Sequence, residues 1–152
     1  MSPRVTEPHL SAWRSLLNAH AAVIARIEQA LSDADLPPLG WYDVLWAVRR
    51  APDRRIRMSE LAGSLTISRG GITKLVDRLA AAGLLTREPA ADDGRGFFAV
   101  LTDAGDQMLR RMWPVYAGVL QETFVDAVSA DEAAAIAAGL ARAGRSAETR
   151  GT

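Results

Sequence analysis

The chain contains no cysteine among its 152 residues, and this absence removes several kinds of chemistry at once. Without thiols, a disulfide framework, a zinc–thiolate site and a cysteine redox switch are all excluded. With only two histidines, a histidine-rich metal site is not expected either. Long hydrophobic runs are also missing: no stretch of about 18 apolar residues occurs, and the N-terminus leads into polar residues. We therefore expect a cytoplasmic protein with no cofactor, no metal and no membrane contact.

Enzymatic signatures are absent too. The sequence has no serine–histidine constellation, no phosphate loop and no paired-carboxylate motif. Its composition, 49% hydrophobic and 24% charged, is ordinary for a globular domain of this length. These features predict a single folded subunit, residues 1–152, that is not an enzyme.

Charge is balanced over the whole chain but is unevenly distributed. Between Arg49 and Arg95 there are ten basic residues against six acidic ones, whereas the remainder has eight against twelve. A basic segment within a neutral chain favours a nucleic-acid partner for that segment. The alternative is that these arginines are simply solvated surface residues.

Apolar positions near the N-terminus recur at alternating spacings of three and four residues, which predicts one long helix with an apolar seam. Pro37 and Pro38 should end it. A second helix is expected over residues 40–50. The seam is longer than one small subunit requires, which favours a dimer; the alternative is that it packs on the C-terminal helices of its own subunit. Its members are Leu10, Trp13, Leu17, His20, Ile24, Ile27 and Leu31.

The middle of the chain reads as a short strand at residues 55–57, a helix over 59–65 and a second helix that follows Ser68 as its N-cap. Gly83 suits the left-handed position that ends this helix. Strands are expected at 85–88 and 97–101, with a long polar connection between them. The predicted fold class is therefore mainly α with a small β-hairpin wing, which is the pattern of a winged helix-turn-helix.

Two further capping signals define the C-terminal part. Thr102 can cap a long helix, and Ser129 with Glu132 has the spacing of a capping box that opens a last helix. The tail after about Gly144 is expected to be frayed.

Four short motifs carry a resemblance to a known family. They are Met58-Ser59-Glu60-Leu61-Ala62, Leu75-Val76-Asp77-Arg78-Leu79, Asp93-Gly94-Arg95-Gly96 and Leu101-Thr102-Asp103-Ala104-Gly105. Together with the order of elements, they resemble the MarR family of bacterial transcription regulators over nearly the whole chain. The resemblance implies a winged-helix homodimer, with a helical dimerisation region formed by residues 8–35 and 103–146 and a DNA-binding lobe at 40–102. It further implies a ligand-responsive repressor that binds a pseudo-palindromic operator in double-stranded DNA. The alternative is a winged-helix protein-interaction module without specific DNA binding.

The resemblance also indicates which residues meet DNA. Arg69 is the expected base reader, and Arg95 at the wing tip is expected in the minor groove or on phosphate, oriented by Asp93. Arg78 is expected either on phosphate or paired with Asp77 or another acidic residue as a structural contact. The full set of expected DNA contacts is Ser68, Arg69, Thr73, Lys74, Arg78, Asp93 and Arg95. Gly70 and Gly71 place direct readout at their own positions in doubt.

A small aromatic or anionic effector, bound between the dimer helices and the lobe, is the ligand that the resemblance implies. The alternative is that the aromatic residues concerned form only core. The candidate pocket residues are Trp13, Arg14, His20, Trp41, Trp46, Trp113 and Tyr116.

Overall fold

The computed structural model describes residues 4–65, 69–91 and 96–150. Within these ranges the chain is mainly helical and carries one small antiparallel sheet. The elements are, in order, α1 (Glu7–Asp33), α2 (Leu39–Arg50), the 3-10 turn η1 (Pro52–Arg54), β1 (Arg55–Arg57), α3 (Met58–Ser64), α4 (Arg69–Ala81), β2 (Leu85–Pro89), β3 (Phe97–Leu101), α5 (Asp103–Leu120), the π-helical turn η2 (Gln121–Val125) and α6 (Ala130–Arg150).

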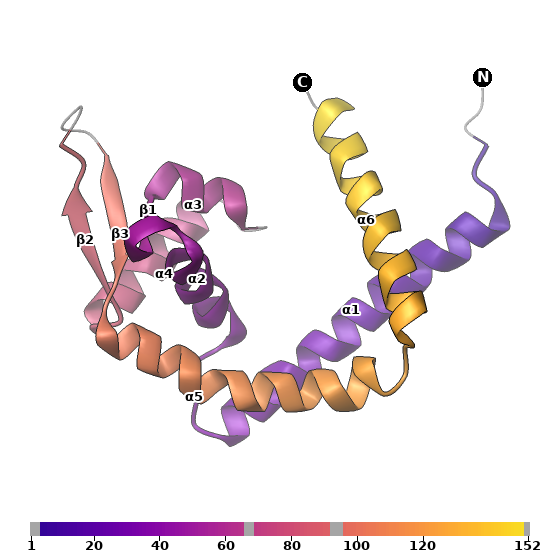
Figure 1. Ribbon diagram of the computed structural model, residues 1–152, viewed down its shortest axis with the longest axis horizontal. Helices are drawn as coiled ribbons and strands as arrows, with labels where there is room; N and C mark the ends of the chain where they lie inside the picture. Colours follow the sequence, from indigo (N-terminus) through magenta and orange to yellow (C-terminus); the bar gives the residue numbers. More distant parts are fainter. Residues whose placement is uncertain (1–3, 66–68, 92–95, 151–152) are drawn as a thin grey trace.

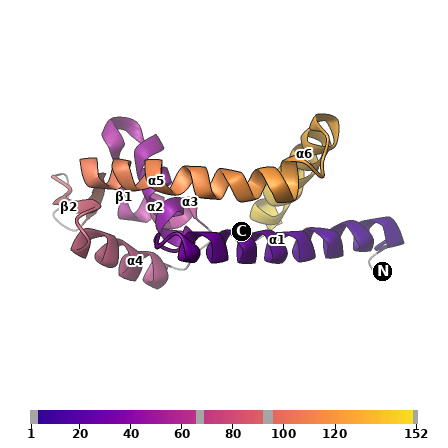
Figure 2. The ribbon, with the colours of Figure 1, turned by 90° about the horizontal axis from the view of Figure 1, so that it is seen from below.

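The molecule has a lobe at one end and long helices at the other. Figure 1 shows α2, α3, α4 and the sheet gathered into the lobe, from which α5 runs away toward α6. Seen from below, α1 and α5 lie side by side along the molecule (Figure 2), and the two helices pack against each other. The lobe is thus attached to the helical region through the α1–α2 turn and through the start of α5.

The core lies where the lobe meets these helices. Val44, Leu45 and Val48 of α2 are fully buried, as are Leu109 and Met112 of α5. Their spacings of three and four residues place each set on one side of its helix. The remaining fully buried large side chains come from α1, α3, α4 and β2, namely Ile27, Leu31, Leu61, Ile72, Val76, Leu79 and Leu85.

The sheet has the order β1-β3-β2, with both pairings antiparallel. Ala99 lies opposite Ile56 on one side and Arg87 on the other, so these three residues share a face. Phe98 lies opposite Arg57 and Glu88 on the other face. The face with Ala99, which is fully buried, is therefore the one that contributes to the core.

The start of α5 is bound closely to the lobe. The Thr102 hydroxyl donates to the Gly83 carbonyl at 2.7 Å and accepts from the Gly105 amide at 3.0 Å. Gly83 has a φ of +74°, as the left-handed position predicted for it requires. A Cβ atom on Gly105 would lie 2.2 Å from the Leu84 carbonyl oxygen, so only glycine permits this approach. The predicted cap at Thr102 is confirmed, and the turn before β2 packs directly on the first turn of α5.

The helices and strands predicted from the sequence are confirmed to within about one residue, but the prediction for the tail is wrong. The helix α6 continues through Gly144 to Arg150. Its last third contains mainly alanine, arginine and glutamate, which are strong helix formers and outweigh the cost of one glycine. The predicted capping box is present, since the Ser129 backbone amide donates to the Glu132 carboxylate at 2.9 Å. The same contact, together with the Ser129 hydroxyl, holds the pKa of Glu132 below its usual range.

Burial along the predicted seam changes from one end of α1 to the other. Ile27 and Leu31 are buried against the lobe end of α5. Trp13 and Leu17, about two and three turns from the start of α1, are 58% and 49% exposed. The chain therefore covers only the second half of its own seam.

Candidate nucleic-acid interface

The helix α4 presents two chemically different sides. Ile72, Val76 and Leu79 are buried in the lobe. Lys74 and Arg78, four residues apart, are exposed on the other side. This helix is the second of the two-helix unit and directly precedes the wing, so its exposed side is the surface predicted to meet DNA.

Only part of the predicted DNA contacts can be placed. Of the predicted contacts, Thr73, Lys74 and Arg78 have exposed side chains on α4. Arg69 begins α4, but its side chain lies outside the described part of the chain, and so do the whole of Ser68, Asp93 and Arg95. Their roles remain predictions.

Gly70 lies in the first turn of α4, and a Cβ atom there would meet no atom within 4 Å. Packing within the subunit therefore does not require this glycine. Its effect is to leave the backbone of the helix start uncovered, where a partner can approach closely.

A charged contact joins α4 to the wing. The Asp77 carboxylate lies 2.9 Å from the Arg87 guanidinium, and that guanidinium lies 5.4 Å from the centre of the Phe97 ring. The contact therefore links α4, β2 and β3. Asp77 therefore contacts the strand, and whether Arg78 meets phosphate or pairs with an acid stays a prediction. Sequence spacing carries no signal for the pairing of Asp77 with Arg87, because this pairing depends on how β2 packs on α4.

Several arginines of the basic segment already have acidic or aromatic neighbours. Arg55 lies 3.3 Å from Glu88 and 4.2 Å from the Phe98 ring centre. Arg49 Nε lies 3.0 Å from Asp106 Oδ1 on α5. Part of the positive charge therefore organises the lobe itself. Glu88 is already counted in the charge balance of the segment, whereas Asp106 lies outside it and offsets one further arginine.

An aromatic cluster lies at the junction of α2 and α5. Tyr42 is stacked with Trp46 and Trp113, with ring centres 6.2 and 6.3 Å apart, and Tyr116 meets it edge-on at 5.2 Å. We call these four residues the aromatic cluster. Tyr42 is buried, whereas Trp46 and Trp113 are 39% and 50% exposed. Burial raises the pKa of both tyrosines, so their hydroxyls remain protonated at neutral pH.

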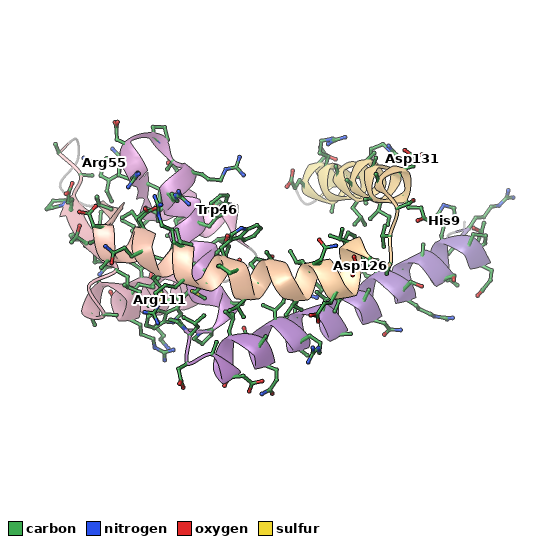
Figure 3. All side chains as sticks on the ribbon, turned by 60° about the horizontal axis from the view of Figure 1, so that its bottom comes forward. His9, Trp46, Arg55, Arg111, Asp126 and Asp131 are labelled. Atoms are coloured by element: carbon green, nitrogen blue, oxygen red, sulfur yellow. The ribbon has the colours of Figure 1, made fainter. Side chains whose placement is uncertain are left out.

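The structure divides the candidate pocket residues into separate groups. Trp46, Trp113 and Tyr116 meet around Tyr42, which sequence analysis overlooked although it lies four residues before Trp46. Trp41 is partly buried and packs on the core. Trp13, Arg14 and His20 are exposed on the outer half of α1. In Figure 3, Trp46 of α2 lies beside α5 near the lobe, whereas His9 lies at the start of α1, at the end of the molecule away from the lobe.

A hollow of about 370 Å³ lies at the turn between α1 and α2, away from the aromatic cluster. The Glu28 carboxylate at its edge accepts from the Leu39 amide at 3.1 Å and so caps α2 from α1. Burial, followed by the nearby Glu28 charge, raises the pKa of Asp43 in the first turns of α2.

Among residues 4–65, 69–91 and 96–150, no three histidine, cysteine or acidic side chains come together as a metal site. No helix in those ranges is both long and apolar enough to span a bilayer.

Known proteins agree with this geometry. Residues 34–96, which include the two-helix unit and most of the hairpin, match the profile of the MarR family. Sco3205, a MarR family transcriptional regulator from Streptomyces coelicolor solved in complex with DNA, superimposes with a TM-score of 0.86 at 27% identity, over 95% of this chain and 91% of that one. The chain is similar to the MarR family both in this segment and in its fold. The superposition extends the likeness beyond the profile, to α1, α5 and α6.

Two curated relatives of this chain are named as helix-turn-helix regulators. YkoM of Bacillus subtilis, an uncharacterised transcriptional regulator, is 30% identical over 50% of this chain and 49% of its own length. IacR of Pseudomonas putida, a transcriptional repressor, is 29% identical over 72% of this chain and 64% of its own length. The chain thus spans between about half and two thirds of the curated relatives that it matches.

Proposed function

We propose that this protein is a regulator of the MarR family, which controls transcription by binding specific sequences of double-stranded DNA through α4 and the wing. The observation that carries the proposal is the exposed side of α4, where Lys74 and Arg78 project from a helix whose other side is fully packed. The Asp77–Arg87 contact supports it, because it holds the wing at a fixed angle to that helix. Sco3205, which has the same fold, was solved with DNA bound.

The proposed active form is a homodimer. Large apolar side chains are exposed at the end of the molecule away from the lobe, where Figure 1 shows the start of α1, the end of α5 and α6. Single exposed apolar residues are ordinary, but a set of this size gathered at one end is typical of an interface. A second copy is the partner that fits, because a two-fold dimer would bring two lobes onto one pseudo-palindromic site. The residues are Trp13, Leu17, Phe124, Val125, Ile136 and Leu140.

Repression and effector response complete the proposal. IacR, one of the relatives, is named a repressor. The aromatic cluster is exposed at Trp46 and Trp113, and the Arg49 guanidinium lies 5.7 Å from the Trp46 ring centre. An aromatic effector with a negative charge would find both a stacking surface and a cation there. Such a regulator would act in the cytoplasm, where the DNA is.

The test is selection of duplexes from a random pool by the purified protein, followed by fluorescence anisotropy on the selected sequence and on a scrambled duplex across a salt series. A regulator should prefer the selected sequence and should lose affinity steeply as salt rises. Sedimentation velocity on the same sample gives the oligomeric state. Selection of no sequence, with weak and equal binding to both duplexes, would instead favour the protein-interaction alternative.

Two substitutions separate the predicted roles of helix and wing. Arg69→Ala should weaken binding to the selected duplex more than to the scrambled one, because a base contact carries sequence information. Arg95→Ala should weaken both and lower the salt slope by about one unit, since a phosphate or groove contact is lost. Arg145→Ala, an exposed change on α6, is the matched control and should alter neither. Equal effects of Arg69→Ala and Arg95→Ala on both duplexes would contradict the assignment.

A further inference from the structure

The lobe meets α5 at a junction that includes a buried charge. Asp106, in the first turns of α5, is only 8% exposed. Its Oδ1 atom lies 3.0 Å from Nε of Arg49 at the end of α2, an ion pair in which this buried oxygen accepts no hydrogen bond from the described residues. Its Oδ2 atom accepts a hydrogen bond from Nε of Arg110 at 3.0 Å. One carboxylate therefore connects a helix of the lobe to α5 and to the next turn of α5 itself.

The carboxylate is charged where it lies. Burial raises the pKa of Asp106, but the hydrogen bond from Arg110 and the charges of Arg49, Arg110 and Arg54 outweigh that effect and lower the pKa below its usual range. Placing an ionised group in a core is an inefficient way to gain stability, since an apolar residue of similar size often does as well or better. The arrangement requires another explanation than added stability.

Direction is what a charged contact adds to apolar packing. Leu109 and Met112 pack α5 on the core, but the free energy of burying apolar surface is non-directional and does not by itself select one angle between α2 and α5. The Asp106 contact opposes rotation of α2 on α5, because such a rotation would pull the Arg49 guanidinium away from a buried negative charge. Gly105, which rests on the Leu84 carbonyl one residue earlier, supplies a fixed point beside it.

We propose that Asp106, held between Arg49 and Arg110, is a positioning residue that sets the orientation of the DNA-binding lobe on α5. Its consequence for DNA rests on the function proposed above. In a dimer, the orientation of each lobe decides the distance between the two copies of α4. That distance must match half-sites about one helical turn apart.

The absence of cysteine makes the orientation directly measurable. Cysteines introduced by Thr86→Cys on β2 and Gly118→Cys on α5 replace exposed residues and accept spin labels. The doubly labelled chain is mixed with an excess of unlabelled protein, so that pulsed dipolar spectroscopy reads the distance within one subunit. The measurement is made with Asp106 intact, with Asp106→Leu and with Arg49→Met. Glu122→Leu is the matched control. Glu122 lies in η2, just after α5, and this change removes an exposed ion pair with Arg26 of α1.

A single narrow distance is expected for the parent and for Glu122→Leu. Broadened or shifted distances are expected for Asp106→Leu and Arg49→Met, with Asp106→Glu returning toward the parent. Arg49→Met retains the Asp106–Arg110 contact, so it serves if Asp106→Leu does not fold. Parent-like distances in folded Asp106→Leu and in Arg49→Met would overturn the proposal.

Binding to the selected duplex separates this proposal from the function on which it rests. Asp106→Leu should bind that duplex on the order of tenfold more weakly. It should bind scrambled DNA as the parent does, because no phosphate contact is removed. Altered distances in a protein whose parent selects no DNA would support the positioning role and refute the proposed function. Altered distances with unchanged affinity for the selected duplex would overturn the role of Asp106 in DNA binding.

Discussion

Replacing Gly105 with alanine should destabilise the protein, although alanine is the better helix former. The added Cβ atom would lie 2.2 Å from the Leu84 carbonyl oxygen and 2.7 Å from Cδ1 of Leu101. The leucine side chain can rotate away, but the carbonyl is backbone and also accepts from the Thr102 amide at 3.3 Å. The start of α5 must therefore move. Such overpacking costs about 1–3 kcal/mol, against up to about 1 kcal/mol gained in helix propensity. We expect a net loss of about 1–2 kcal/mol.

Thermal unfolding measures this loss directly. For a chain of this length, each kcal/mol shifts the midpoint by about 2–4 °C, so Gly105→Ala should unfold about 2–8 °C below the parent. Gly118→Ala is the control on the same helix, because a Cβ atom there meets nothing within 4 Å. That variant should be more stable than the parent by up to about 1 kcal/mol. The reasoning fails if Gly105→Ala is stabilised as much as Gly118→Ala.

Two further predictions concern charged groups. Asp77→Ala and Arg87→Ala should each change the free energy of unfolding by less than about 1 kcal/mol, because the pair is partly exposed. Each should nevertheless weaken binding to the selected duplex, and the double variant should be no weaker than either single one; additive losses would mean that the two residues act separately. Asp43→Asn should raise the midpoint of unfolding at pH 7, since the folded-state pKa of Asp43 lies above its unfolded value and the charged form is disfavoured in the folded protein. The gain should shrink as pH falls through the folded pKa and vanish below the unfolded value near about 3.9, and an equal gain at pH 7 and pH 3 would contradict this cause.

Local patterns predicted the local structure well. The cap at Thr102, the left-handed Gly83 and the capping box at Ser129 each depend on residues within a few positions of one another. The seam along α1 was also readable, because helical periodicity needs only the helix itself. The two-helix unit and the following hairpin are local in the same sense, and their order along the chain is enough to predict a winged helix-turn-helix.

The contacts that position the lobe could not be predicted in the same way. Asp106 and Arg49 are far apart in sequence, and Asp77 meets Arg87 only because β2 returns along α4. Pairings of this kind depend on how whole elements pack, and sequence spacing does not encode them. The candidate pocket shows the same limit, since Trp46 and Trp113 meet around Tyr42 while Trp13 lies on the outer half of α1.

The helix α5 also acts as a lever. It runs without interruption for 18 residues, which at about 1.5 Å per residue is a length of about 27 Å. A tilt of about 10° at its first turn would displace its far end by about 5 Å, which exceeds the spacing of about 3.4 Å between successive bases along a DNA strand. In the proposed dimer, a small adjustment of the contacts around Gly105 and Asp106 would therefore move the two lobes by more than one base-pair step. It would change which spacing of half-sites the protein fits.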